Sequence, residues 1–140
     1  MIVMNTAQTG SEWDSVVNSA AFDKPQFIKR TQDYMFLSDI GVIETLLSVY
    51  AFHAEFFPEN DGTVTASLDE IDLVENGANE HDALQKLAGA ILEYSKDYYG
   101  DYSYWARGER KAHLPYVIKS LILNNAQKIG GLIKCRHGRT

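Results

Sequence analysis

The sequence has little of what builds a membrane anchor, a disulfide framework or a secretion signal. Its 140 residues include a single cysteine, Cys135, which excludes an internal disulfide and a cysteine-based metal cluster. The apolar run from Val117 to Leu123 contains a lysine and a serine and is far shorter than the ~20 residues of a membrane span. The N-terminus lacks the basic segment and long apolar core of a secretory signal. We therefore predict a cytoplasmic protein without a membrane partner.

Basic residues are scarce over most of the chain. Residues 1–106 hold five Lys/Arg and 18 Asp/Glu, a net charge of −13, whereas residues 107–140 hold eight Lys/Arg and one Glu, a net charge of +7. This split predicts either two binding surfaces of opposite charge or a basic C-terminal segment that packs against an acidic body.

Hydrophobic periodicity predicts alternating short elements in the first third of the chain. Residues 1–10 read as a loose tail, and Trp13, Val16 and Val17 have helical spacing in the segment that follows. After Pro25, the runs QFIKR and DYMFLS predict a hairpin. Ser38 or Asp39 is then expected to cap a helix.

The centre of the chain predicts strands followed by one long helix. Residues 52–58 and 63–68 alternate along two expected strands around an Asn60–Gly62 turn, and residues 70–77 are expected to add a third strand. Asn79 is a favourable N-cap for a helix that ends at Gly100. A polar and aromatic connector, 101–113, is expected to lead into two further helices, the first beginning near Pro115.

These elements predict an α+β fold, with a small antiparallel sheet of three to five strands packed against the long helix and with flanking N- and C-terminal helices. The expected segments, within one compact domain overall, are 1–19, 20–49, 50–100 and 101–140.

Catalytic and metal-binding patterns are weak. The four histidines form no close ligand pair, and Cys135-Arg136-His137 is a Cys-x-His at an expected frayed end, so we predict neither a metal nor another cofactor. The acidic residues 69, 70, 72 and 75 are more typical of a solvated or partner-facing surface than of acid–base catalysis. The strongest chemical candidate is a basic group beside aromatic residues, which suits RNA phosphates and bases; its members are Arg107, Arg110, Lys111 and His113. The alternative interpretation is a packed connector whose aromatic residues cover the long helix.

The order of the elements resembles antitoxins of toxin–antitoxin systems. Residues 50–99 resemble the HicB-type strand–turn–strand–helix module, with Asp61-Gly62 at the turn and with Glu80, Ala83 and Leu84 at the helix opening. Residues 24–50 resemble the second half of Phd/YefM-type antitoxins, and the matching positions are Pro25, Ile28, Arg30, Leu37, Ser38 and Asp39. Over residues 20–137, the combined order resembles RelB-like antitoxins.

The resemblance implies a dimeric, non-enzymatic protein that binds and neutralises a small basic ribonuclease toxin, with operator DNA as a further expected partner. An acidic body would speed the encounter with such a toxin. The candidate toxin-binding residues are Tyr98, Tyr102, Tyr104, Trp105, Asp69, Glu70 and Asp72. The candidate DNA-binding residues are Lys24, Lys29 and Arg30. Two alternatives remain, namely RNA binding or processing through segment 107–113, and a stand-alone structural module.

Overall fold

The computed structural model describes residues 4–5 and 13–137, and the chain divides into two compact units, residues 1–48 and 49–140. The first unit contains a three-stranded sheet in the order β1-β2-β3, with β1 parallel and β3 antiparallel to β2. Its elements are β1 (Met4–Asn5), α2 (Trp13–Phe22), β2 (Gln26–Arg30), β3 (Asp33–Leu37) and α3 (Ile40–Leu47). The predicted hairpin and helices are therefore confirmed. The tail expected over residues 1–10 lies outside the described residues except for β1.

Local side-chain chemistry explains the boundaries in this unit. The turn between β2 and β3 places Thr31 at a φ of 54°, in the left-handed region. The Asp39 carboxylate accepts a hydrogen bond from the Gly41 backbone N–H at 2.9 Å, which confirms the predicted cap of α3. Among the described residues of this unit, the buried apolar side chains are Val16, Ala20 and Ile28.

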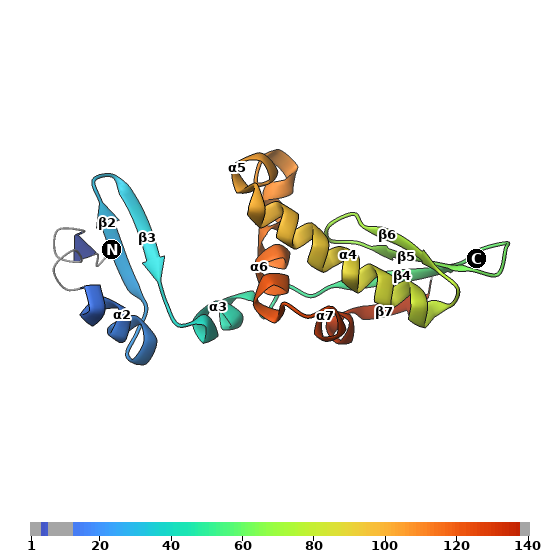
Figure 1. Ribbon diagram of the computed structural model, residues 1–140, viewed down its shortest axis with the longest axis horizontal. Coiled ribbons are helices and arrows are strands. Elements are labelled where there is room, and N and C mark those ends of the chain that lie inside the picture. The colour runs from blue at the N-terminus through green and yellow to red at the C-terminus, as the bar shows by residue number, and fades with distance from the viewer. Residues whose placement is uncertain (1–3, 6–12, 138–140) are drawn as a thin grey trace. The chain divides into compact units, whose positions relative to one another are not determined.

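In the second unit, a four-stranded sheet with the order β6-β5-β4-β7 packs against the long helix α4, and α6 and α7 pack against α4 in turn (Figure 1). The strands are β4 (His53–Pro58), β5 (Val64–Leu68), β6 (Val74–Gly77) and β7 (Lys134–His137). The helices are α4 (Glu80–Gly100), α5 (Tyr102–Trp105), the 3₁₀ helix η1 (Gly108–His113), α6 (Leu114–Leu123) and α7 (Ala126–Leu132). The predicted α+β class is confirmed.

Alternation along the strands creates the core of this unit. Ala54 and Phe56 on β4 are buried beside Ala66 and Leu68 on β5, and their registers are Ala54 opposite Leu68 and Phe56 opposite Ala66. The buried stripe of α4 covers this face of the sheet, because its apolar residues recur at helical spacing; its members are Ala83, Leu87, Ala88, Ile91, Ser95 and Tyr98.

Three segments differ from our expectations. Residues 70–73 turn instead of extending, with Asp72 at a φ of 54°, so that the third strand begins only at Val74. The connector 101–113 forms α5 and η1. The expected frayed end at Cys135–His137 is instead part of β7, which pairs in parallel with β4 and makes the sheet mixed. Each of these depends on contacts between residues far apart in the chain, which local periodicity does not report.

Candidate functional site

A cluster of aromatic side chains lies at the end of α4, and the residues that follow α4 fold back onto it. Tyr94, Tyr98 and Tyr102 recur every fourth residue, and Asp101 ends α4 with φ −132° and ψ 61°, which breaks the helix before α5. The Tyr98 ring is fully buried, and its hydroxyl donates to the Arg110 carbonyl oxygen at 2.8 Å. This bond ties η1 to α4. Burial raises the pKa of Tyr98, so the phenol stays protonated as the donor.

The predicted RNA-binding Arg110 is held within this cluster. Its guanidinium carbon lies 4.9 Å from the ring centre of Tyr104 and 4.8 Å from that of Trp105. Its Nη2 also donates to the Tyr104 carbonyl oxygen at 2.9 Å. Cation–π stacking and this hydrogen bond hold the Arg110 side chain against residues of the same chain.

His113 is likewise occupied. Its Nδ1 lies 2.6 Å from the Tyr94 hydroxyl, and the two rings meet edge to face. Burial lowers the pKa of His113, and Arg110 lowers it further, whereas Asp72 acts in the opposite direction. A neutral imidazole at this position suits a packing role within the fold.

The other two basic candidates lie at the surface. Arg107 donates through Nε to the Ser103 carbonyl oxygen at 2.6 Å and is exposed. Lys111 is exposed and forms no salt bridge with another described residue. Since Arg110 and His113 are used internally, the arrangement favours the packed-connector interpretation of this segment over an RNA-processing centre.

The predicted toxin-binding residues fall into two groups. Tyr102 and Tyr104 are about half exposed at the turn after α4, while Trp105 is partly buried and meets the Tyr104 ring edge to face. Tyr98 is fully buried and supports Tyr102 from below, with ring centres 6.1 Å apart. Tyr98 therefore positions the surface and is not itself accessible to a partner.

The acidic candidates lie at the β5–β6 turn, and of these Asp72 is close enough to His113 to oppose the lowering of its pKa by burial. Asp69 accepts from Arg136 of β7 at 2.7 Å, and the same guanidinium lies 3.6 Å from Glu55. The Glu70 carboxylate accepts from the His53 backbone N–H at 3.2 Å. Asp69 and Glu70 therefore hold the sheet together, whereas Asp72 remains exposed.

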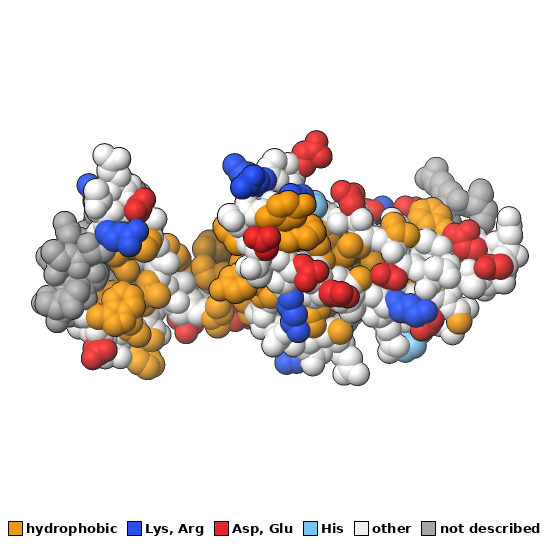
Figure 2. Space-filling model, turned by 45° about the horizontal axis from the view of Figure 1, so that its top comes forward, with side chains coloured by type: hydrophobic (Ala, Val, Ile, Leu, Met, Phe, Trp, Pro, Cys, Tyr) orange, Lys and Arg blue, Asp and Glu red, His pale blue; other side chains and the backbone are white. Residues whose placement is uncertain are grey.

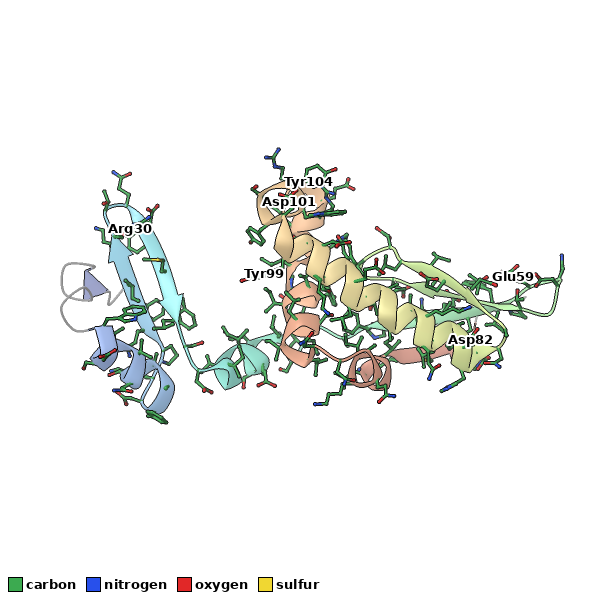
Figure 3. All side chains as sticks on the ribbon, viewed as in Figure 1. Arg30, Glu59, Asp82, Tyr99, Asp101 and Tyr104 are labelled. Atoms are coloured by element: carbon green, nitrogen blue, oxygen red, sulfur yellow. The ribbon has the colours of Figure 1, made fainter. Side chains whose placement is uncertain are left out.

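Sequence reasoning missed a row of carboxylates on α4. Glu93 and Asp97 are exposed at i and i+4, and Asp101 follows four residues later at the end of the helix. Figure 3 shows Asp101 and Tyr104 together at this turn, with Tyr99 on the last turn of α4. The four-residue spacing of these acidic residues could have identified them as neighbours on one face of the helix. The charge count did not, because it gives only totals over long ranges.

The predicted DNA-binding residues lie in the first unit. Lys24 is exposed before β2, Lys29 lies 5.6 Å from the ring centre of Tyr34, and Arg30 pairs with Asp33 at 3.3 Å. Because Lys29 and Arg30 are consecutive residues of a strand, their side chains point to opposite faces of the sheet. The structure therefore brings the three cations to one hairpin but not to one face of it.

An apolar groove of about 530 Å³ runs between α4 and α7. Its lining includes Leu84 and Ala88 of α4 and Gly130 and Gly131 of α7. Among residues 4–5 and 13–137, no group of three or more His, Cys, Asp and Glu side chains is placed to hold a metal ion. In that same part of the chain, no helix is both long and apolar enough to cross a membrane.

Comparisons with known proteins agree with the resemblance noted from the sequence. The Phd-like family, described as antitoxins of RelE/RelB toxin–antitoxin systems, has a model that matches residues 1–135. A crystal structure at 1.80 Å of an antitoxin part of a proposed toxin/antitoxin system from Syntrophomonas wolfei subsp. wolfei is 30% identical and superposes with a TM-score of 0.91, covering 99% of this chain and 100% of that one. No curated protein matches the chain. The family match spans nearly the whole sequence, and the chain therefore belongs to the Phd-like family of toxin–antitoxin antitoxins.

Proposed function

We propose that this antitoxin binds and neutralises a small basic ribonuclease toxin without catalysing a reaction itself. The observation that carries the proposal is the family match over residues 1–135. The charge distribution supports it, since the net charge of −13 over residues 1–106 would attract a basic partner and speed its encounter. The acidic and aromatic surface of the 49–140 unit is the proposed toxin-binding part.

The toxin proposal is tested by purifying the tagged chain from its own host and assaying what co-purifies. We expect a stoichiometric small basic protein that cleaves RNA when separated and stops cleaving it when the chain is added back at an equal molar amount. Cleavage that continues in the presence of excess chain contradicts the proposal, as does a co-purified protein without ribonuclease activity.

A second part of the proposal concerns self-association through the 1–48 unit. Only three of its described apolar side chains are buried, which is too small a core for independent stability, since units of this size usually need oligomerisation or a staple. Large apolar side chains remain exposed instead and include Trp13, Val17, Phe22, Phe27, Tyr34, Met35, Phe36, Ile40 and Leu46. A homodimer that covers part of this surface supplies the missing core.

The third part of the proposal is operator binding, in which Lys24, Lys29 and Arg30 contact DNA phosphates. A dimer would pair two such hairpins and so bring six cations together. This larger number compensates for the fact that, in one copy, the cations lie on two faces of the sheet. The test is a mobility-shift titration with DNA from upstream of the chain's own gene. The K24A/K29A/R30A variant should lose binding and flatten the salt dependence.

Lys96 provides the matched control for this titration, because it is exposed on α4 in the other unit. The K96A variant should bind DNA as the unaltered chain does. Equal losses in K96A and in the triple variant would indicate nonspecific attraction and would remove the hairpin from the DNA proposal.

A further inference from the structure

The four-stranded sheet of the 49–140 unit has two edges of opposite charge. β6 forms one edge and β7 forms the other, at opposite sides of the sheet (Figure 1). β7 contains Lys134, Arg136 and His137, and basic side chains of this kind protect an edge strand from pairing with a further strand. β6 has the sequence VENG, with Glu75 as its charged residue. The β6 edge therefore lacks the basic side chains that protect β7.

The backbone of β6 directs hydrogen-bonding groups away from the sheet. The Leu68 N–H donates to the Leu73 carbonyl oxygen at 2.8 Å, at the point where β5 meets the start of β6. Bonded and non-bonded pairs alternate along an antiparallel ladder, so Glu75, two residues further on, bonds again to β5. The N–H and carbonyl groups of Val74 and Asn76 consequently point outward, where a strand from outside could pair with them.

One of these outward groups has a partner on α4. Lys86 Nζ lies 3.4 Å from the Asn76 carbonyl oxygen and 3.2 Å from the Asp82 carboxylate. The first distance is longer than that of a typical N–H···O hydrogen bond, and the Lys86 side chain is 53% exposed. A strand that pairs with β6 would displace this weak contact and leave the pair with Asp82 in place.

The surface around β6 is acidic. Residues 54–79 contain seven Asp/Glu and no Lys, Arg or His. Three of these carboxylates pair with cations from outside the range. Asp72 and Glu75 form no salt bridge with another described residue. Figure 2 shows acidic and apolar side chains beside one another on the visible face of the 49–140 unit.

Glu75 narrows the choice of occupant. A strand that pairs antiparallel with β6 places one residue directly opposite Glu75 in a non-hydrogen-bonded pair, where side chains approach most closely. Two copies of this chain, paired with Val74 opposite Asn76, would bring their two Glu75 carboxylates together, which is destabilising. A nucleic acid would be repelled by the carboxylates of residues 54–79. A lysine or arginine opposite Glu75 instead forms a favourable cross-strand pair.

We infer that the β6 edge, Val74–Gly77, binds an extended segment of a partner protein that pairs antiparallel with β6 and places a lysine or arginine opposite Glu75. The Val74 side chain, which is 59% exposed, gains an apolar neighbour on the added strand. The inference goes beyond the proposed function, because it assigns a surface and a mode of recognition that do not require the partner to be a ribonuclease.

The test titrates the full chain at low ionic strength with two blocked peptides, Ac-TVTKTVT-NH2 and Ac-TVTETVT-NH2, which differ only in the central residue. Binding is followed by NMR chemical shifts and by amide hydrogen exchange. We expect the lysine peptide to bind about fivefold more tightly than the glutamate peptide. The backbone N–H groups of Val74 and Asn76 should gain protection from exchange, whereas no amide of β7 should.

The E75K variant should reverse the preference, so that the glutamate peptide binds more tightly. The matched control is E93K, which makes the same change in net charge at an exposed position of α4 and should keep the preference for the lysine peptide. No binding of either peptide by the unaltered chain, equal affinities for the two peptides, or the same reversal in E93K would each overturn the inference. Since neither peptide is a toxin, these outcomes do not depend on whether a toxin co-purifies with the chain.

Discussion

At the scale of single residues, tyrosines that share one stripe of the sequence have different environments. Tyr98 and Tyr102 are four residues apart, yet Tyr98 is fully buried and Tyr102 is half exposed. The stripe itself was predictable from its helical spacing. The difference in exposure between Tyr98 and Tyr102 was not predictable from the sequence. It depends on η1, which folds back so that the Arg110 carbonyl oxygen accepts a hydrogen bond from the Tyr98 hydroxyl.

The Y98F variant should lower the free energy of unfolding by about 1 kcal/mol, because it removes the donor to the Arg110 carbonyl oxygen and leaves that acceptor without its partner. Urea denaturation followed by circular dichroism measures this difference. The Tyr102 hydroxyl has no hydrogen bond to another described residue, so Y102F is the matched control and should leave stability unchanged. Equal effects of the two substitutions would show that the bond to Arg110 does not stabilise the fold.

The burial of His113 predicts how the stability of the fold depends on pH. Burial holds its pKa below the ordinary 6.5, so the unfolded chain takes up a proton more readily than the folded chain. Its contribution is therefore fully present above pH 6.5 and is lost as the pH falls from there towards the lower pKa of the folded state. Comparing denaturation midpoints at pH 7.5 and 5.5, we expect H113Q to lose less stability on acidification than the unaltered chain does.

The control for this comparison is Q85A, since Gln85 is exposed on α4 and has no titratable group. Q85A should show the same loss on acidification as the unaltered chain. A steeper loss in H113Q than in the unaltered chain would contradict the assignment of a lowered pKa to His113.

At the scale of elements, α4 fits closely against the sheet at one point. A Cβ atom on Gly77, at the end of β6, would lie 2.3 Å from the Ala83 backbone nitrogen in α4. The sequence suggested only that Gly77 ends a strand. Glycine is needed at this position because the backbones of β6 and α4 approach each other closely there. That approach depends on how the helix crosses the sheet.

The G77A variant should destabilise the fold by at least about 2 kcal/mol, because neither backbone can move away without separating β6 from α4. The G89A variant provides a contrast. Gly89 lies inside α4, and a Cβ there meets nothing within 4 Å, so the better helix propensity of alanine should raise stability by about 1 kcal/mol. Thermal melts of both variants measure the two effects, and a neutral G77A would show that β6 and α4 separate easily.

At the scale of the whole molecule, the two units differ in their cores. The 49–140 unit has a continuous apolar cluster between its sheet and α4, whereas the 1–48 unit buries only three described apolar side chains. If the 1–48 unit completes its core by dimerisation, its unfolding temperature depends on protein concentration, while that of the other unit does not. Calorimetry over a hundredfold range of concentration should therefore show one transition that rises with concentration and one that stays constant.

Leu46 tests the same proposal directly. It is 60% exposed at the end of α3, so L46S should cost little in a monomer but should lower the concentration-dependent transition if a second copy covers it. Leu132, 46% exposed near the end of α7, supplies the control L132S, which should leave that transition unchanged. Two transitions that are both independent of concentration would exclude the dimer.

The sequence by itself determined the local elements and the class of the fold. Asp39 and Asn79 marked helix starts, and alternation around Asp61-Gly62 marked two strands, because caps, turns and periodicity depend on residues close together in the chain. Only the tertiary structure decided that residues 134–137 form β7 and that Arg110 stacks on Tyr104 and Trp105. Those outcomes depend on contacts between distant residues, whose free energies local composition does not encode.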